Sequence, residues 1–172
     1  MTIRKLVLLV GALAALAAVT ALPGGAADTA TSFTLTGGLL SISAPTGNVS
    51  LGTQVASTSP TTISGHLGTV TVTDQRGGAT TWVASVIVTA FTPIPAATAI
   101  AAINVHYVAG TVTESGVTTV LPGTTDLTGV SPVVNGTSTG ISSASWNPTI
   151  SVDVPANAPP GVYSATITHS VA

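Results

Sequence analysis

The 172-residue chain contains no cysteine and few charged or aromatic residues. The absence of cysteine excludes disulfide bonds, thiol nucleophiles and thiolate metal sites. Charged residues make up 5% of the chain, whereas about a quarter of the residues of an ordinary soluble domain are charged. Thr, Ser, Gly and Asn must therefore cover the surface in place of charge. The length suits one domain, and that domain has to be held together by its apolar core alone.

The first 27 residues have the pattern of a secretory signal peptide. Arg4 and Lys5 precede an apolar run over 6–22, and small residues follow up to Ala27. This order is typical of signal peptides. We therefore expect cleavage after Ala27 and a secreted domain over 28–172. An uncleaved N-terminal membrane anchor is the alternative, although the apolar run is slightly short for a membrane span.

Removal of residues 1–27 leaves a domain with one positive side chain, Arg76. It stands against five acidic residues, a net charge of −4: Asp28, Asp74, Glu114, Asp126 and Asp153. Nucleic-acid binding requires several cations to neutralise phosphates, so this composition excludes nucleic acid as a partner. The same argument excludes attachment by charge to anionic lipids or anionic wall polymers.

Short stretches that alternate apolar and polar residues, separated by Gly and Pro, predict an all-β fold. Thr and Val dominate these stretches, and both fit pleated strands. We expect roughly eight to ten strands in an antiparallel β-sandwich of Ig-like or Greek-key type, with a closed barrel as the alternative. No amphipathic helix is expected. The expected strands are 33–42, 49–55, 63–73, 103–112, 117–121, 145–154 and 163–171, with 92–102 as a crossing segment and 122–140 as a loop.

Residues 68–91 predict a β-hairpin and contain Arg76 and Trp82, which belong to the residue types that are rare in this chain. Two alternating runs flank the polar, Gly-rich segment 74–78, which is the hairpin pattern. Arg76 lies two residues beyond Asp74, so it either pairs with that carboxylate and holds the turn, or donates to a ligand. In the second case Trp82 would supply a stacking surface, although both tryptophans are also candidates for core anchors.

The sequence carries no catalytic, cofactor or metal-binding pattern. The three histidines, His66, His106 and His169, lack the compact spacing of metal ligands. No nucleophile elbow or phosphate loop occurs, and the acids are too scattered to nominate a carboxylate pair for glycoside hydrolysis. We therefore expect a non-catalytic protein without a cofactor. His169 lies on the apolar face of the last expected strand, which predicts a core or rim histidine with one partner for a ring nitrogen.

The central stretch resembles the first motif of the WxL domain, a cell-surface domain of Gram-positive bacteria. In that family a strand ends in Asp-x-Arg-Gly and leads into a strand with Trp-x-Leu. Here Asp74, Arg76, Gly77 and Trp82 stand at these positions, and Ala84 replaces the typical Leu.

Two further segments are similar to the same family. The opening LSISAP over 40–45, followed by VSLG over 49–52, is similar to the family's first strand, proline turn and next strand. Residues 154–168, including Gly161 and Tyr163, are similar to its closing hairpin. Where the family has its second Trp-x-Leu, this chain has His169-Ser170-Val171.

The resemblance implies an all-β domain that attaches non-covalently to the cell wall, through peptidoglycan, beside other surface proteins. It suggests ligand contact at Asp74, Arg76 and Trp82, with Tyr163 and His169 at the second motif. A different hypothesis is a structural or assembly subunit of a surface layer or fibre, or an adhesion module for another surface protein. Low charge and Thr- or Val-rich strand edges suit such strand-to-strand association.

Overall fold

The computed structural model describes residue 25, residues 27–121 and residues 125–172. The chain divides into two units, Met1–Thr34 and Leu35–Ala172. In the first unit the described residues form no helix or strand, and their side chains are exposed. The predicted signal peptide lies outside the described residues, apart from Gly25 and Ala27. Over the described part of the chain, no helix is long and apolar enough to cross a membrane.

The regular structure of the second unit consists almost entirely of β-strands, as the composition predicts. Among the described residues its regular elements are β1 (Leu40–Ser43), β2 (Thr61–His66), β3 (Val70–Asp74), β4 (Thr80–Val88), β5 (Thr92–Ile94), the short 3-10 helix η1 (Ala102–Asn104), β6 (Val105–Val108), β7 (Val112–Val120), β8 (Thr125–Asp126), β9 (Ser131–Trp146), β10 (Thr149–Val154), β11 (Val162–Ser164) and β12 (Ile167–Val171).

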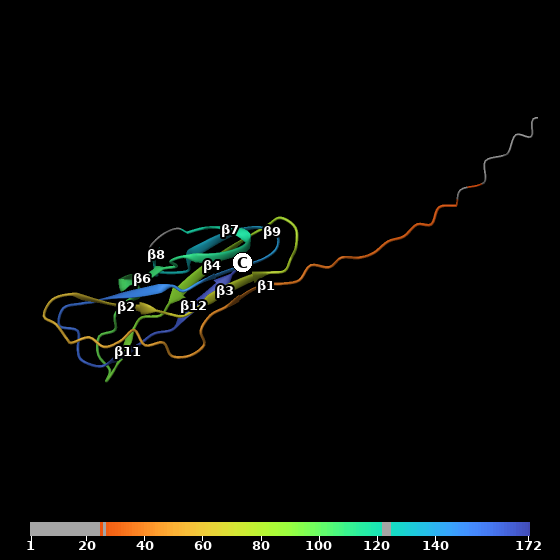
Figure 1. Cartoon of the computed structure of the whole chain (residues 1–172). Coiled ribbons are helices and arrows are strands. Elements are labelled where there is room, and N and C mark those ends of the chain that lie inside the picture. Colours follow the sequence, from red (N-terminus) through yellow and green to blue (C-terminus); the bar gives the residue numbers. More distant parts are fainter. Residues whose placement is uncertain (1–24, 26, 122–124) are drawn as a thin grey trace, which may run out of the picture. The chain divides into compact units, whose positions relative to one another are not determined.

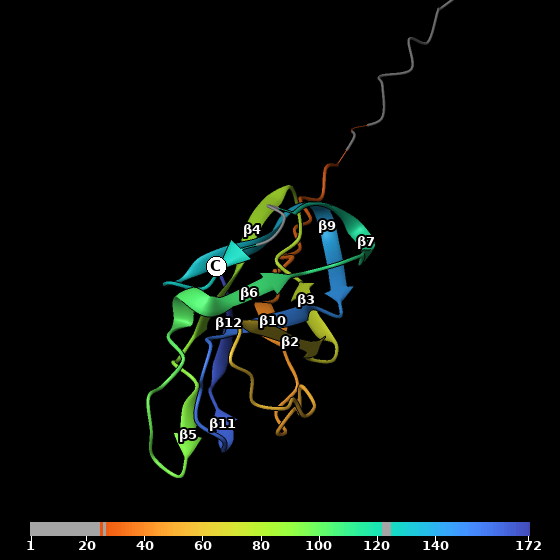
Figure 2. The same ribbon diagram turned by 90° about the vertical axis from the view of Figure 1, so that its left-hand side faces the viewer.

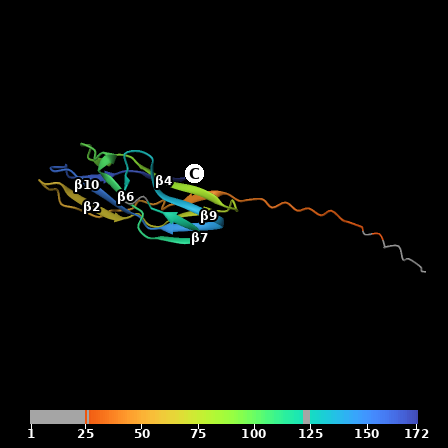
Figure 3. The same cartoon turned by 90° about the horizontal axis from the view of Figure 1, so that it is seen from above.

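The strands form antiparallel sheets that pack together (Figure 1). The larger sheet holds β1, β3, β4, β7, β9 and β12, and the second sheet holds β2, β6, β8 and β10. Figure 3 shows β2, β6 and β10 grouped beside β4, β7 and β9. A two-stranded ribbon of β5 and β11 lies at one end of the domain (Figure 2). Val72 and Val86 from one sheet and Val105 and Ile150 from the other are fully buried in one apolar core. The predicted antiparallel all-β sandwich is confirmed.

The long strand β9 is the centre of the larger sheet. β3 pairs with residues 142–146 of β9, and β4 pairs with residues 131–138, both in antiparallel register. β7 pairs along both of these stretches. β3 and β4 therefore run in the same direction along successive parts of β9 and are not partners of each other. The predicted hairpin over 68–91 is wrong: residues 75–79 interrupt a long extended run instead of reversing it.

Most of β9 falls in the segment 122–140 that the sequence predicts to be a loop. Val134 and Trp146 are buried near its two ends, but the inward positions between them are small, as at the buried Gly136, Ser138 and Ala144. The reason lies on the neighbouring strand, because the indole of Trp82 covers Gly136 so closely that a Cβ there would overlap the ring. Since Trp82 fills this space, β9 carries no apolar side chain at position 136, and the alternating pattern of a strand is lost from its sequence.

Several expected strands are divided in the structure, two of them at glycine or proline. The expected strand 63–73 becomes β2 and β3 in different sheets, with Gly68 between them at φ +97°. The expected strand 145–154 is shared by β9 and β10, which Asn147-Pro148 separates. The expected last strand 163–171 is divided into β11 and β12.

Other expected strands are shorter or absent. Residues 33–39 and 49–55 form no strand, and Phe33 and Leu35 are 91% and 90% exposed. The expected strand 103–112 is reduced to β6 and the first residue of β7. Residues 117–121 belong mainly to β7, which pairs with β9 and not with β6. These segments have strand-like composition, but pairing partners decided which of them became strands.

Candidate functional site

The buried carboxylate of Asp74 holds the segment between β3 and β4. Its Oδ1 accepts hydrogen bonds from the backbone N–H of Arg76 at 3.1 Å and from Nε of Arg76 at 2.9 Å. Its Oδ2 accepts from Nη2 of Arg76 at 2.9 Å and from the Thr80 hydroxyl at 2.7 Å. The Arg76 guanidinium contributes most to holding the pKa of Asp74 well below its usual range, against the opposing effect of burial. The carboxylate is therefore charged although it is fully buried.

These contacts assign a structural role to the first predicted motif. Asp74 is 0% exposed and Trp82 is 2% exposed, so neither offers a surface to a ligand. Arg76 also donates from Nη2 to the carbonyl of Thr81 at 2.9 Å, which ties the start of β4 to the end of β3. The prediction that Arg76 pairs with Asp74 is confirmed. The idea of Trp82 as a stacking surface is wrong, because the side chain is part of the core.

A groove of about 820 Å³ lies beside the residues of the second predicted motif. One wall is the loop 45–57, another is the segment 158–167, and apolar side chains such as Ile63 and Val154 lie between them. None of its described lining residues is Asp, Glu, Lys or Arg. Both residues of the second predicted motif, Tyr163 and His169, line this groove. The structure therefore brings Tyr163 and His169 to one site and leaves Asp74, Arg76 and Trp82 outside it.

His169 ends a chain of hydrogen bonds that begins in the core. The buried Nε1 of Trp146 donates to the Tyr107 hydroxyl at 2.8 Å. That hydroxyl lies 3.3 Å from Nε2 of His169, and the two rings meet edge to face at 5.8 Å. Burial lowers the pKa of His169, which favours a neutral ring whose Nε2 accepts the Tyr107 proton. The predicted histidine with one ring partner is confirmed.

Tyr163 fixes the rim of the groove. It is half-buried, and its hydroxyl donates to the carbonyl of Pro159 at 2.9 Å. Its backbone lies opposite Pro93 in the pairing of β11 with β5. The loop that precedes β11 is therefore tied to the strand that follows it, so this wall of the groove has a defined position.

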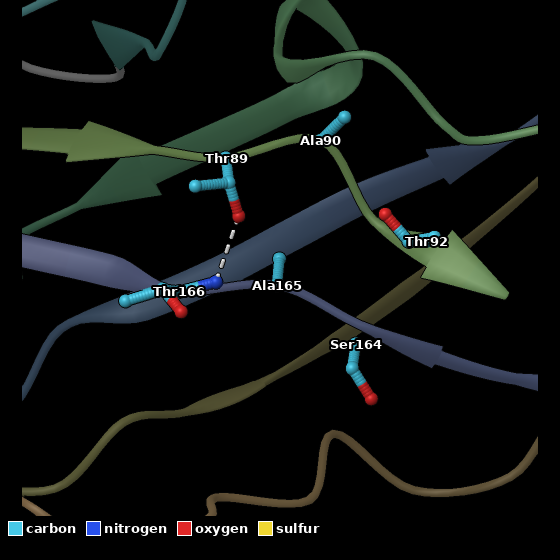
Figure 4. A pocket seen from close by; sticks show the side chains of 6 residues that line it. All are labelled: Thr89, Ala90, Thr92, Ser164, Ala165 and Thr166. Carbon is cyan, nitrogen blue, oxygen red and sulfur yellow. Dashed lines mark hydrogen bonds between the residues drawn. The ribbon is translucent and has the colours of Figure 1, made fainter.

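A smaller hollow of about 300 Å³ lies where β4 leads into β5 and β11 leads into β12. Figure 4 shows its lining of small side chains, with the hydroxyl of Thr89 accepting a hydrogen bond from the Thr166 N–H at 2.9 Å. This side-chain bond replaces a backbone bond where both strands are interrupted. The hollow is lined by Thr89, Ala90, Thr92, Ser164, Ala165 and Thr166, which supply hydroxyl and methyl groups without an acid or a base.

Sequence reasoning missed a cluster in the second sheet, where His106 lies between two carboxylates. Its Nδ1 is 2.6 Å from Oδ1 of Asp126, and its Nε2 is 2.9 Å from Oδ2 of Asp153. The hydrogen bond to Asp153, and then the one to Asp126, raise the pKa of His106. The Thr62 hydroxyl, which donates to Asp153 at 2.7 Å, and then His106 lower the pKa of Asp153.

No spacing in the sequence signals this cluster, because its members come from β6, β8 and β10. Both ring nitrogens of His106 are engaged by carboxylates. In the part of the chain that the structure describes, no three His, Asp or Glu side chains are arranged to hold a metal ion.

The groove with Tyr163 and His169 is the larger of the two hollows and the best candidate for ligand binding. Its volume falls in the range of about 300–1,000 Å³ that is usual for small-molecule sites. Searches of family models, curated proteins and solved structures found no match to this chain.

Proposed function

We propose that the protein is a secreted, non-catalytic cell-surface protein that binds cell-wall glycan through the groove between the loop 45–57 and the segment 158–167. The observation that carries the proposal is the groove itself, about 820 Å³ in volume and without a charged side chain among its described lining residues. A neutral sugar chain presents hydroxyl groups and apolar ring faces, and it needs no charge from its partner.

The groove offers matching groups to such a ligand. Exposed amides from Asn48 and Gln54 and the hydroxyl of Thr53 lie along the loop wall. On the opposite side, Tyr163 and His169 add aromatic surface. Because Nε2 of His169 accepts from Tyr107, the neutral ring carries its proton on Nδ1 and keeps one hydrogen-bond donor.

The resemblance to the WxL domain supports peptidoglycan as the glycan. In that resemblance the first motif and the second motif were both candidates for contact. The geometry favours the second, since Tyr163 and His169 line the groove whereas Asp74 and Trp82 are buried. The replacement of the family's second Trp by His169 changes the chemistry of the groove without removing the groove.

Sedimentation with purified, insoluble peptidoglycan tests this function. The chain over 28–172 is mixed with peptidoglycan and, separately, with cellulose, and the bound fraction is measured after centrifugation. We expect retention on peptidoglycan above that on cellulose, and a several-fold loss for the double variant Asn48→Ala/Gln54→Ala.

Gln75→Ala is the matched control, because Gln75 is also an exposed amide but does not line the groove. It is expected to be retained like the wild type. Thermal unfolding followed by circular dichroism shows that each variant is folded. Equal retention of the wild type on both polymers would refute the function, whereas equal retention of wild type and double variant would refute the site.

A further inference from the structure

The outer edge of β12 forms no ladder with another described strand, although β1 lies near this strand. Among the described strands β12 pairs with β4 alone. The backbones of Val83 and Ala172 exchange both hydrogen bonds, at 2.9 and 3.1 Å. In the alternating antiparallel pattern, Ile167, His169 and Val171 therefore direct their N–H and C=O groups away from β4. Over residues 167–171 the strand has no proline, no acidic or basic residue other than His169, and no register shift against β4.

The opposite edge of the same sheet is protected. β7 is interrupted at Gly116, where φ is +66° and the register with β9 shifts. Beyond this interruption, Oε1 of Glu114 accepts a hydrogen bond from the backbone N–H of Thr119 at 2.7 Å. A bulge and a charged side chain at an edge strand are common means of preventing the addition of another strand. Among the described strands of the larger sheet, β1, β7 and β12 each have one ladder partner. Of these, β7 is blocked, and β12 combines an unpaired edge with the neighbouring apolar groove.

The arm over residues 28–36 has the pattern of a missing strand. Ser32, Thr34 and Thr36 alternate with Phe33 and Leu35, as in a strand with one apolar face. Phe33 is 91% exposed and Leu35 is 90% exposed, so neither is buried. Fully extended, the arm is about 30 Å long, and it needs to match only the 5 residues of β12.

The chemistry of the arm suits the groove beside β12. A strand added to β12 turns alternate side chains toward the groove, which Ile63, Val154 and Ile167 line with partly buried apolar surface. Phe33 and Leu35 would lie on that surface, and the threonines between them would face solvent. The arm carries one charge, Asp28 at its start, and the described groove residues carry none.

From these observations we infer that the arm 28–36 of one molecule adds as a strand to the free edge of β12 in a second copy of this chain. Exchange of arms between two copies gives a closed dimer, and transfer from each copy to the next gives a fibre. The inference does not rest on wall binding. Because the arm and a glycan would occupy the same groove, an associated copy has a closed groove and a copy without a bound arm has an open one.

Light scattering of the chain over 28–172, from low micromolar to millimolar concentration, tests the inference. We expect a mass that rises above that of the monomer. The arm variant Phe33→Ser/Leu35→Ser and the edge variant Thr168→Lys/Ser170→Lys are both expected to stay monomeric. Thr168 and Ser170 are exposed, so neither substitution disturbs the core. Thr118→Lys on the blocked edge is the matched control and is expected to associate like the wild type.

Amide hydrogen exchange gives a second measurement. On association the amides of His169 and Val171 should become at least tenfold more protected, and a peptide of residues 28–36 should give the same protection to the arm variant. A monomer at every concentration overturns the inference, and so does association that both double variants retain. Retention of the arm variant on peptidoglycan reports wall binding separately, so failure of one proposal is distinguishable from failure of the other.

Discussion

Both carboxylate oxygens of Asp74 accept hydrogen bonds at 2.9 Å from the guanidinium of Arg76, two residues further along the chain. The pair closes the gap between β3 and β4, which share β9 as their partner. Gly38 supports this gap from the other side, since its N–H donates to the carbonyl of Gln75 at 2.6 Å. The Asp74–Arg76 pair, which belongs to the motif that resembles the WxL domain, thus holds β3 and β4 in line along β9.

The substitution Asp74→Asn should lower the free energy of unfolding by roughly 1–3 kcal/mol, because an amide at this buried position cannot accept all four of the hydrogen bonds that the carboxylate accepts. Urea unfolding measures this difference. The folded pKa of Asp74 is lowered, so its stabilisation is present above the unfolded value of about 4 and is lost as pH falls below it. Asp126→Asn, at a side chain 63% exposed, should change stability at pH 6 much less. Equal effects would contradict a special role for Asp74.

The substitution Gly136→Ala should destabilise the protein by more than about 2 kcal/mol, because the new Cβ overlaps the Trp82 indole and the core has no room to yield. The neighbouring Gly140 on the same strand has open space at its Cβ position, so Gly140→Ala is the matched control and should change stability little. A second variant, Gly136→Ala/Trp82→Leu, should regain part of the loss. Thermal unfolding of the variants measures both effects, and an unchanged midpoint for Gly136→Ala would contradict this packing.

The substitution Tyr107→Phe should cost about 1–3 kcal/mol, because it leaves the buried Nε1 of Trp146 without its acceptor. It also removes the donor to Nε2 of His169. The imidazole of His169 can then titrate without competition from the Tyr107 proton, so its pKa should rise from the wild-type value in an NMR titration. Leu40→Val, a change at a partly buried residue that neither belongs to this network nor lines the groove, should leave the His169 titration unchanged.

The cluster of His106, Asp126 and Asp153 should make stability fall as pH rises above the unfolded histidine pKa of about 6.5. The folded pKa of His106 is raised, so its stabilisation is fully present below the unfolded value of about 6.5 and is lost as pH rises through the folded value. His106→Gln should abolish this part of the pH dependence, and Asp153→Asn should reduce it. Urea unfolding between pH 5 and 9 measures the trend. A pH dependence that is the same in the wild type and in His106→Gln would contradict the arrangement.

The sequence predicts the strands whose own side chains fill the core. It misses β9, the strand with which β3, β4 and β7 pair. β3, β4 and β12 alternate clearly because apolar side chains such as Val72, Trp82 and Ile167 occupy inward positions. β9 carries Gly136 and Ser138 at the same depth, because its neighbour fills the space. A pattern search of one segment cannot recognise this kind of complementarity between segments.

The contacts at the candidate sites are likewise of two kinds, local ones that the sequence predicts and long-range ones that it does not. The link between Asp74 and Arg76 is local and follows from their spacing, so the sequence predicts it. The hydrogen bonds that join Trp146, Tyr107 and His169 connect three strands and carry no local pattern. The groove depends on two loops that are more than 100 residues apart in the chain, and only the assembled sheets bring them together.

The position of β9 also determines when this domain can fold. β3, β4 and β7 all require residues 131–146 as their partner, so the first half of the chain can form only the β1–β3 ladder of this sheet until the second half is present. Sheets assembled from such distant segments form slowly. During synthesis β3, β4 and β7 therefore lack their common partner until residues 131–146 have been made, so the larger sheet is completed only by the last part of the chain.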